Sequence, residues 1–402
     1  MHAALLSLAV TLLAAAPAPQ TNAIPAKLVD EIAGLVEQQF YSPAKMEKVG
    51  WKAAVEKARK AIAQAATPAA RTAVLREMLA VLATSHTEFY PRDDPSYAAL
   101  LSIYDRILSK SCGSGPPFPV VHEDIGVFWK QSGNDWFVGG VLAGGPAASA
   151  GLKLGDRVAT ADGQPFSPVQ SFAGKSSVSL QIQSVQNGPL TRLDVAPTAT
   201  RPIEEFRKAT ADSWQIVERN GKRIAYLHIW AWSSVEIQQT VQEAIAKSNG
   251  KKVDAFIVDL RDGWGGASPS YLEIFFQGVP LLESLGRDGE RTAFDVQIRK
   301  PAVLLINDGS RSGKEPVAYG AKKHHLATLV GERTAGAVTF GRPTCLSDGS
   351  LLYVAAADAL VDGERLEGRG VSPDIQVPFD FRYAGGKDLQ LERALELLSG
   401  AK

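Results

Sequence analysis

Ser312 occupies a position in the sequence where a side chain could do nucleophilic chemistry. It follows a short apolar run of strand length at residues 302–306 and a turn-prone cluster at residues 307–309. A helix fits from Lys314 onward, with an acidic residue in its first turn and basic residues at its end. A hydroxyl at such a strand-to-helix turn is exposed and lies beside free backbone N–H groups that can stabilise a developing oxyanion. A serine there can equally cap the helix, and taken alone the position favours the cap.

Two nearby side chains compete with Ser312 for a chemical role. Ser310 lies in the same turn and could be the reacting hydroxyl. Lys314 could act as the base of a local Ser-Lys pair, but a side chain in the first helical turn is expected to point to solvent. Gly309 comes three residues before Ser312 rather than two, so the segment does not match the G-x-S-x-G elbow of α/β-hydrolases.

Metal and redox chemistry have little support in the sequence. No C-x-x-C, H-E-x-x-H or other set with metal-ligand spacing is present, and His324 and His325 are more simply surface charges at a helix end. The two cysteines, Cys112 and Cys345, are far apart, so we expect two free buried thiols, although an oxidising compartment would allow them to pair. We therefore expect no metal and no cofactor.

The length of the chain, its charge balance and its first residues restrict the class of protein to which it can belong. A chain of 402 residues predicts two or three domains, and its 43 basic and 43 acidic side chains offer no electrostatic case for a nucleic-acid partner. Residues 3–16 are mostly apolar and too few to span a bilayer, which is typical of a signal peptide. We expect cleavage after a leader at residues 1–23, export to the periplasm or medium, and no integral membrane segment afterwards.

Residues 24–113 are expected to form a helical N-terminal domain. Apolar residues between 28 and 40 share one helical face, and alanine-rich segments follow at 51–66 and 69–82. Tyr41-Ser42-Pro43 interrupts the first helix. His86 lies in the loop that follows these helices. Its local sequence alone does not indicate a catalytic role.

Residues 117–198 change to short alternating strands and resemble a PDZ domain. The resemblance rests on Ile125-Gly126-Val127 and on the run GPAASAGLKLGDRV at residues 145–158. It implies that an extended peptide adds as a strand, with its carboxylate bound by backbone N–H groups near Gly126. A small β-barrel that only spaces its neighbours is the alternative.

Residues 203–400 alternate predicted strands and helices, which indicates an α/β core with right-handed crossovers. A glycine-rich turn at residues 261–266 and the turn before Ser312 would open at the same edge of the sheet, where sites usually lie. The expected strands are 223–229, 255–260, 302–306, 328–331, 351–356 and 375–377.

Four motifs in this region resemble, in order, those of the C-terminal-processing and tricorn-core serine peptidases. The resemblance covers nearly the whole mature chain. It implies an α+β multidomain fold with an N-terminal helical domain, a PDZ-like β-barrel and an α/β catalytic core of the ClpP and crotonase type. The motifs are VDLRDGWGG (258–266), SRSGKE (310–315), GERTAG (331–336) and EGRGVSPDI (367–375).

The resemblance also implies which side chains react. The processing branch has a lysine base at the position that Ala337 occupies here, so this chain lacks that base. It instead resembles the tricorn-like branch, which uses a Ser-His pair and a glutamate. The matching residues here are Ser85, His86 and Glu367. Ser312 would attack the peptide carbonyl, and His86, with an unperturbed pKa of about 6.5, would move the proton near neutral pH.

The same resemblance places the oxyanion on backbone groups. The N–H of Gly313 and one from Gly265-Gly266 would hold it. Glu367 could instead pair with a neighbouring arginine, and Arg261 is expected to brace its turn rather than react. The predicted function is an exported serine endopeptidase acting on peptides or proteins. A homologue that binds a peptide or a small ligand without hydrolysing it is the alternative.

Overall fold

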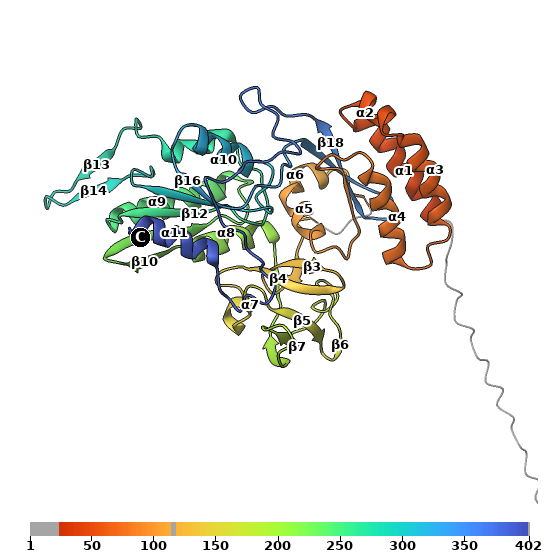
Figure 1. Ribbon diagram of the computed structural model, residues 1–402, viewed down its shortest axis with the longest axis horizontal. Coiled ribbons are helices and arrows are strands. Elements are labelled where there is room, and N and C mark those ends of the chain that lie inside the picture. Colours follow the sequence, from red (N-terminus) through yellow and green to blue (C-terminus); the bar gives the residue numbers. More distant parts are fainter. Residues whose placement is uncertain (1–23, 114–117, 401–402) are drawn as a thin grey trace, which may run out of the picture.

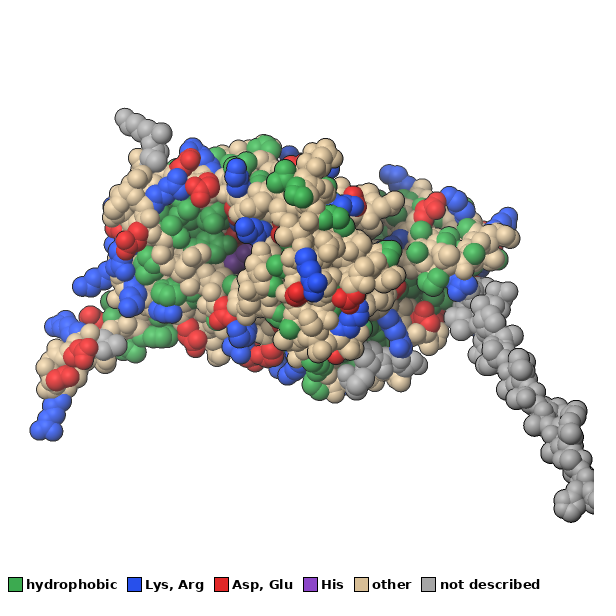
Figure 2. Space-filling view, turned by 90° about the horizontal axis from the view of Figure 1, so that it is seen from below, with side chains coloured by type: hydrophobic (Ala, Val, Ile, Leu, Met, Phe, Trp, Pro, Cys, Tyr) green, Lys and Arg blue, Asp and Glu red, His purple; other side chains and the backbone are tan. Residues whose placement is uncertain are grey.

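The computed structural model of this chain describes residues 24–113 and 118–400. The expected signal peptide, residues 1–23, lies outside the described residues. The described part has a mixed α/β multidomain fold in which a helical region, a β-rich region and a region of sheet and helices lie against one another (Figure 1). Its surface carries no large patch of one charge on the face shown in Figure 2, where basic and acidic side chains are interspersed. None of the described helices is both long and apolar enough to cross a membrane.

The central sheet of the third region positions the turn before Ser312. Its strands β11, β12, β15, β16 and β19 are parallel and β10 is antiparallel, and strands β12 and β15 are buried along their whole length. Such continuously apolar strands are typical of a parallel sheet covered on both faces. The order is β10 (Gln215–Arg219), β11 (Lys222–His228), β12 (Ala255–Asp259), β15 (Ala302–Ile306), β16 (Thr328–Gly331) and β19 (Ile375–Gln376).

Helices cover both faces of this sheet. Side chains of α8 (Pro202–Ser213), α9 (Val235–Gly250) and α10 (Lys314–Lys323) share one apolar core with one face, and α11 (Leu389–Ser399) packs on the other. The segment after β12 forms a 3-10 helix, η1 (Pro269–Phe275), with Ser268 as its cap. A hairpin of β13 (Leu282–Leu285) and β14 (Arg291–Phe294) projects from the sheet region (Figure 1).

A second, three-stranded sheet corrects one sequence expectation. The strand expected near residues 351–356 does not extend the central sheet; as β18 (Leu351–Ala357) it pairs with β1 (Glu88–Tyr90) and β17 (Phe340–Cys345). Figure 1 accordingly shows blue β18 beside the orange N-terminal helices. This pairing brings the chain just before β1, which holds His86, next to the C-terminal half.

The faces of β18 explain why it leaves the central sheet. Leu352 and Val354 pack among the four N-terminal helices, whereas Leu351 and Tyr353 point to the opposite side, toward α5 and α6. Successive side chains of a strand alternate between faces, so a strand with apolar residues on both can join two helical groups. The helices are α1 (Ile24–Gln39), α2 (Pro43–Lys48), α3 (Trp51–Ile62), α4 (Pro68–Ala80), α5 (Tyr97–Ile103) and α6 (Asp105–Leu108).

The local signals in the helical region are confirmed. The interruption at residues 41–43 is real, because the Ser42 hydroxyl accepts the N–H of Lys45 and caps α2, with Pro43 at its first position. Thr67 caps α4 in the same way through the N–H of Ala70. These caps fix where each helix begins.

The β-rich region is a twisted sheet joined to the rest by two short strands. We call these paired strands, β2 (His122–Asp124) and β9 (Thr198–Thr200), the stalk. A short helix, α7 (Pro146–Ala150), packs on the sheet. The sheet strands are β3 (Val127–Ser132), β4 (Asp135–Val141), β5 (Arg157–Ala161), β6 (Gln164–Pro165), β7 (Val178–Gln183) and β8 (Thr191–Val195).

The expectation of two free thiols is wrong. Cys112, after α6, and Cys345, at the end of β17, form a disulfide with their Cα atoms 5.2 Å apart. This separation is ordinary for a disulfide. Sequence spacing could not predict it, because 233 positions separate the two residues and only the β1–β18–β17 sheet brings them together.

Candidate active site

Ser85, His86 and Glu367 form a continuous hydrogen-bonded relay. The Ser85 hydroxyl donates to Glu367 Oε2 at 2.8 Å and lies 3.0 Å from His86 Nδ1. The Ser85 backbone N–H donates to the other carboxylate oxygen, also at 2.8 Å. The relay therefore joins residues 282 positions apart, and it depends on the β1–β18 pairing.

The hydrogen bonds of the relay indicate which nitrogen of the His86 ring carries the proton. The single proton of Ser85 goes to Glu367, and Thr339, a residue that the sequence did not single out, donates its hydroxyl proton to the Ser85 carbonyl at 3.0 Å. Both hydroxyl oxygens then face Nδ1 of His86 as acceptors, at 3.0 and 3.3 Å. This arrangement favours a ring that carries its proton on Nδ1 and leaves Nε2 free to accept one.

Both oxygens of the Glu367 carboxylate accept hydrogen bonds at this site. Its Oε2 also accepts the N–H of Val338 at 2.9 Å. The alternative that it pairs with a neighbouring arginine is wrong, because Arg365 binds Asp358 and Arg369 lies beside Glu364.

Ser312 lies at the sharp turn that the sequence predicted, but it does not cap the helix. Gly313 is the N-cap of α10 and no side chain caps that end, so the cap interpretation fails. Ser312 has φ of 56°, in the left-handed region that non-glycine residues seldom adopt, and its N–H donates to the Ala337 carbonyl at 2.9 Å. Such strain persists only where the surroundings hold it, which is common at functional sites.

The structure brings His86 and Ser312 to one small cavity of about 60 Å³. Among the described residues no hydrogen bond joins the two side chains; contacts of this kind are often loose before substrate binds. The cavity is lined by His86, Tyr90, Leu100, Ile103, Tyr104, Trp264, Gly265, Gly266, Arg311, Ser312 and Tyr353.

The glycine-rich turn at residues 263–266 packs directly on the Ser312 turn. A Cβ on Gly265 would lie 2.5 Å from the Cβ of Ser312, and a Cβ on Gly313 would lie 2.3 Å from the Ala267 backbone. Both positions therefore require glycine, because any larger residue would push the two turns apart. The candidate oxyanion groups of Gly265, Gly266 and Gly313 consequently lie beside Ser312.

The electrostatics of His86 differ from the sequence expectation. Burial, and then the positive charge of Arg311, lower the pKa of His86 to about 4, while Glu88 acts in the opposite direction. The ring is therefore neutral at pH 7, which is the form in which an imidazole can accept a proton. The expectation of an unperturbed pKa is wrong, because sequence alone gave no measure of burial at this loop.

Ser310 and Lys314 are structural rather than competing reactive groups. Ser310 is fully buried; its hydroxyl donates to the Leu260 carbonyl at 2.8 Å and accepts the Asn307 N–H. Lys314 does not point to solvent as expected, since it is fully buried and donates to the carbonyl of Asp262 at 2.7 Å. Burial lowers the pKa of Lys314 to about 7.

Glu315 is a second site residue whose role the sequence did not reveal. It is fully buried and accepts hydrogen bonds from the Thr334 hydroxyl at 2.6 Å and from the N–H groups of Gly336 and Ala337 at 2.8 and 2.7 Å. It thereby fixes the segment whose Ala337 carbonyl holds Ser312. Its place in the first turn of a helix suggested only a favourable charge.

Two further sequence-predicted groups lie outside this cavity. Arg261 binds Asp259 and Asp388 and so braces its turn against the start of α11, as expected. In the β-rich region Val127 begins β3 and Ile125 and Gly126 directly precede it; the N–H of Ile125 donates to the Asp124 carboxylate at 2.6 Å.

Known proteins of similar sequence were compared with the chain. It is 25% identical to tricorn protease homolog 2 of Streptomyces coelicolor, covering 92% of this chain and 32% of that protein. It is 29% identical to the chloroplastic carboxyl-terminal-processing peptidase 2 of Arabidopsis thaliana, covering 59% and 49%. The chain thus spans half or less of the length of these two curated relatives.

Solved structures and a family model agree with these relatives. The fold is similar to the tricorn protease, with a TM-score of 0.56 at 18% identity over 94% of this chain and 36% of that one. It is also similar to the photosystem II D1 C-terminal processing protease, with a TM-score of 0.51 at 20% identity over 91% and 98%. Residues 223–377 match the sequence model of Peptidase family S41. This span holds all four motifs, so the resemblance that was inferred from them to this peptidase family is confirmed.

Proposed function

We propose that this chain is a serine endopeptidase that hydrolyses peptide bonds through an acyl-enzyme. The observation that carries the proposal is the Glu367–Ser85–His86 relay, which ends at the cavity that also holds Ser312. A neutral imidazole with its proton on Nδ1 is the form that can accept the proton of a serine hydroxyl. The match of residues 223–377 to the model of peptidase family S41 supports the same chemistry.

In this mechanism Ser312 Oγ attacks the peptide carbonyl while Nε2 of His86 takes the hydroxyl proton. The imidazolium then gives that proton to the leaving amine, and a water activated by the same nitrogen hydrolyses the acyl-enzyme. The Ser85 hydroxyl, polarised by Glu367, orients the ring and stabilises its positive charge, as the acid of a Ser-His-Asp triad does.

The oxyanion is assigned to the N–H of Gly313 and to one from Gly265-Gly266. The close packing of the two glycine turns supports this assignment, because it holds backbone donors beside Ser312 without side chains in the way. One such donor contributes on the order of 3 kcal/mol to transition-state stabilisation in comparable sites.

A fluorophosphonate probe and a peptide hydrolysis assay test the proposal. We expect Ser312→Ala to lose both labelling and turnover, and His86→Ala to lose turnover while the chain stays folded. Ser347→Ala, an exposed serine away from the cavity, is the matched control and keeps both. Labelling that survives Ser312→Ala, or full turnover in His86→Ala, would refute the assignment.

A second candidate function is that of a homologue that binds a peptide or a small ligand without hydrolysing it. One observation favours it, because no hydrogen bond joins the side chains of His86 and Ser312 among the described residues. Under this alternative, folded wild-type protein is not labelled by the probe and hydrolyses no peptide in a broad library. Labelling at Ser312 excludes it.

We further propose that the β-rich region, residues 117–198, is a PDZ domain between a helical domain (24–113) and the peptidase core (203–400). A groove of about 390 Å³ runs between Val127 and Trp129 of β3 and the turn at Val169, which supports docking of a peptide end along β3 near Gly126. Val169→Asp should then raise KM for a peptide with a free carboxylate but not for its amidated form. Equal effects on both peptides would point to a spacer.

Export of the protein is part of the proposal. The apolar segment at residues 3–16 supports a leader, and the Cys112–Cys345 disulfide supports an oxidising compartment. Secretion of an epitope-tagged chain from a host cell, and its loss when residues 1–23 are removed, would test this point.

A further inference from the structure

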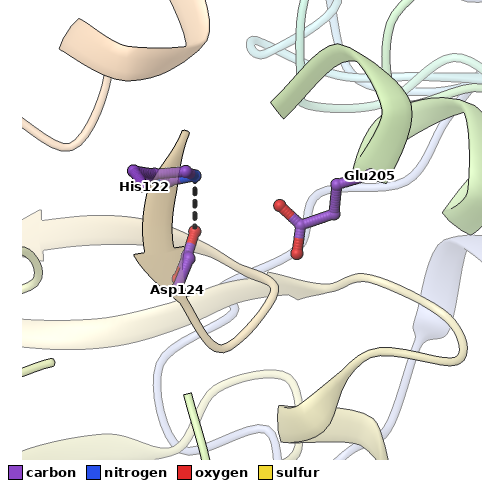
Figure 3. Close-up of side chains that lie close together, drawn as sticks. All are labelled: His122, Asp124 and Glu205. Carbon is purple, nitrogen blue, oxygen red and sulfur yellow. Dashed lines mark ion pairs between the residues drawn. The ribbon is translucent and has the colours of Figure 1, made fainter. Parts of the chain in front are cut away.

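Three potential metal ligands converge where the stalk meets α8. His122 and Asp124 are alternate residues of β2 and so share one face of that strand, and Glu205 lies in the first turn of α8. Figure 3 shows the Glu205 carboxylate facing the other two side chains. One ligand atom from each residue lies within 4.8 Å of the others.

The histidine supplies an observation that is independent of the two acids. Nε2 of His122 is buried and has no hydrogen-bond partner among the described residues. It lies 3.8 Å from Asp124 Oδ2, which is beyond hydrogen-bond distance. A buried ring nitrogen without a partner is costly, and a metal ion is one of the few groups that would satisfy it.

The two carboxylates also have no cation to balance them. Among residues 24–113 and 118–400, no lysine or arginine forms an ion pair with Asp124 or Glu205; Arg207 pairs with Glu204. A divalent ion would supply the missing positive charge.

We propose that His122, Asp124 and Glu205 bind a divalent transition-metal ion of the zinc type. One imidazole and two carboxylates suit zinc better than calcium or magnesium, which prefer oxygen ligands alone. The Asp124 side chain is already oriented, because the N–H of Ile125 holds its Oδ1 and leaves Oδ2 toward His122. Zinc ligands lie about 2.0–2.2 Å from the ion, so binding requires the three ligand atoms to approach one another from their present separations of up to 4.8 Å.

An ion at this position would link two parts of the molecule. β2 and β9 are the stalk of the β-rich region, whereas α8 packs into the core of the central sheet through Phe206 and Ala209. An ion bound to β2 and α8 together fixes the β-rich region relative to the core. The sequence did not suggest this site, because its three ligands come from two elements and match no metal motif.

Zinc binding to untagged, full-length Ser312→Ala protein tests the proposal without interference from turnover. Equilibrium dialysis followed by elemental analysis is expected to give one zinc per chain, and zinc should raise Tm. His122→Asn and Glu205→Gln should each weaken binding at least tenfold and remove the zinc-dependent rise in Tm. Glu204→Gln, a neighbouring acid of α8 that is exposed, is the matched control and should bind zinc as the parent does.

A second measurement keeps the proposal testable if a variant misfolds. Anomalous diffraction at the zinc edge from crystals of the unsubstituted chain should give one peak between His122, Asp124 and Glu205. No zinc bound at micromolar concentration, a peak elsewhere, or binding unchanged in both folded variants would overturn the proposal.

Discussion

At the scale of single residues, burial and two charged neighbours of His86 set the protonation state of the proposed base. The ring lies between Arg311, which lowers its pKa, and Glu88, which raises it, and these two side chains are themselves 3.6 Å apart. Burial is the larger cause of the shift to about 4. The site therefore keeps a neutral imidazole over a wider acidic range than a free histidine would.

Substitution of the two charged neighbours should move the pH dependence in opposite directions. A base works only when deprotonated, so the acid limb of kcat/KM for wild type is expected near pH 4 rather than 6.5. Arg311→Gln removes a positive charge and should shift this limb to higher pH, whereas Glu88→Gln should shift it lower. The midpoint of each pH profile is the measurement, and shifts of the same sign would contradict this electrostatic account.

At the scale of elements, the first turn of α10 and the segment at residues 334–337 act as one unit. Glu315 binds that segment through three hydrogen bonds, and the segment returns a carbonyl, that of Ala337, to the N–H of Ser312. The strained conformation of Ser312 is thus supported from a neighbouring loop. Ala337 occupies the position at which the processing branch has a lysine. Here it contributes through its backbone carbonyl.

Glu315→Gln should loosen this support with little change in size. The amide presents an NH₂ group to one of the backbone N–H donors, so a buried hydrogen bond is lost at a cost of about 1–3 kcal/mol. We expect a lower Tm and a loss in kcat/KM of about tenfold or more. Glu364→Gln, an exposed acid, is the control, and a Glu315→Gln protein with wild-type turnover would show that the segment needs no such anchor.

At the scale of the whole molecule, the site exists because distant parts of the chain are tied together. The β1–β18–β17 sheet joins the helical region to the C-terminal half, and the Cys112–Cys345 disulfide closes the same junction covalently. His86 and Ser85 lie on the helical side of this junction, whereas Ser312 and Glu367 lie in the C-terminal half. Motion between the two parts would therefore separate His86 from Ser312.

Removal of the disulfide should weaken this junction. Cys112→Ser with Cys345→Ser is expected to lower the free energy of unfolding by about 2–5 kcal/mol, as for other native disulfides that close long loops. Denaturant unfolding measures the change, and reduced wild-type protein should behave as the double variant does. Unchanged stability in both samples would mean that the sheet alone holds the two parts together.

The sequence by itself determined the local elements and the chemical candidates. Caps, breaks and apolar runs predicted the helices before residue 83, the strand at 302–306 and the turn that carries Ser312, because these signals act within a few residues. The four ordered motifs predicted the resemblance to the C-terminal-processing and tricorn-core serine peptidases, and that resemblance proposed Ser85, His86 and Glu367 as site residues before any distance was known.

Only the tertiary structure decided how these parts meet. The sequence of a strand does not specify the strand with which it pairs. The tertiary structure was therefore needed to place β18 in the second sheet, and with it the disulfide and the relay. The burial of Lys314 and the lowered pKa of His86 also depend on groups far away in sequence. Burial and charge are properties of a whole three-dimensional neighbourhood, and no local stretch of sequence contains them.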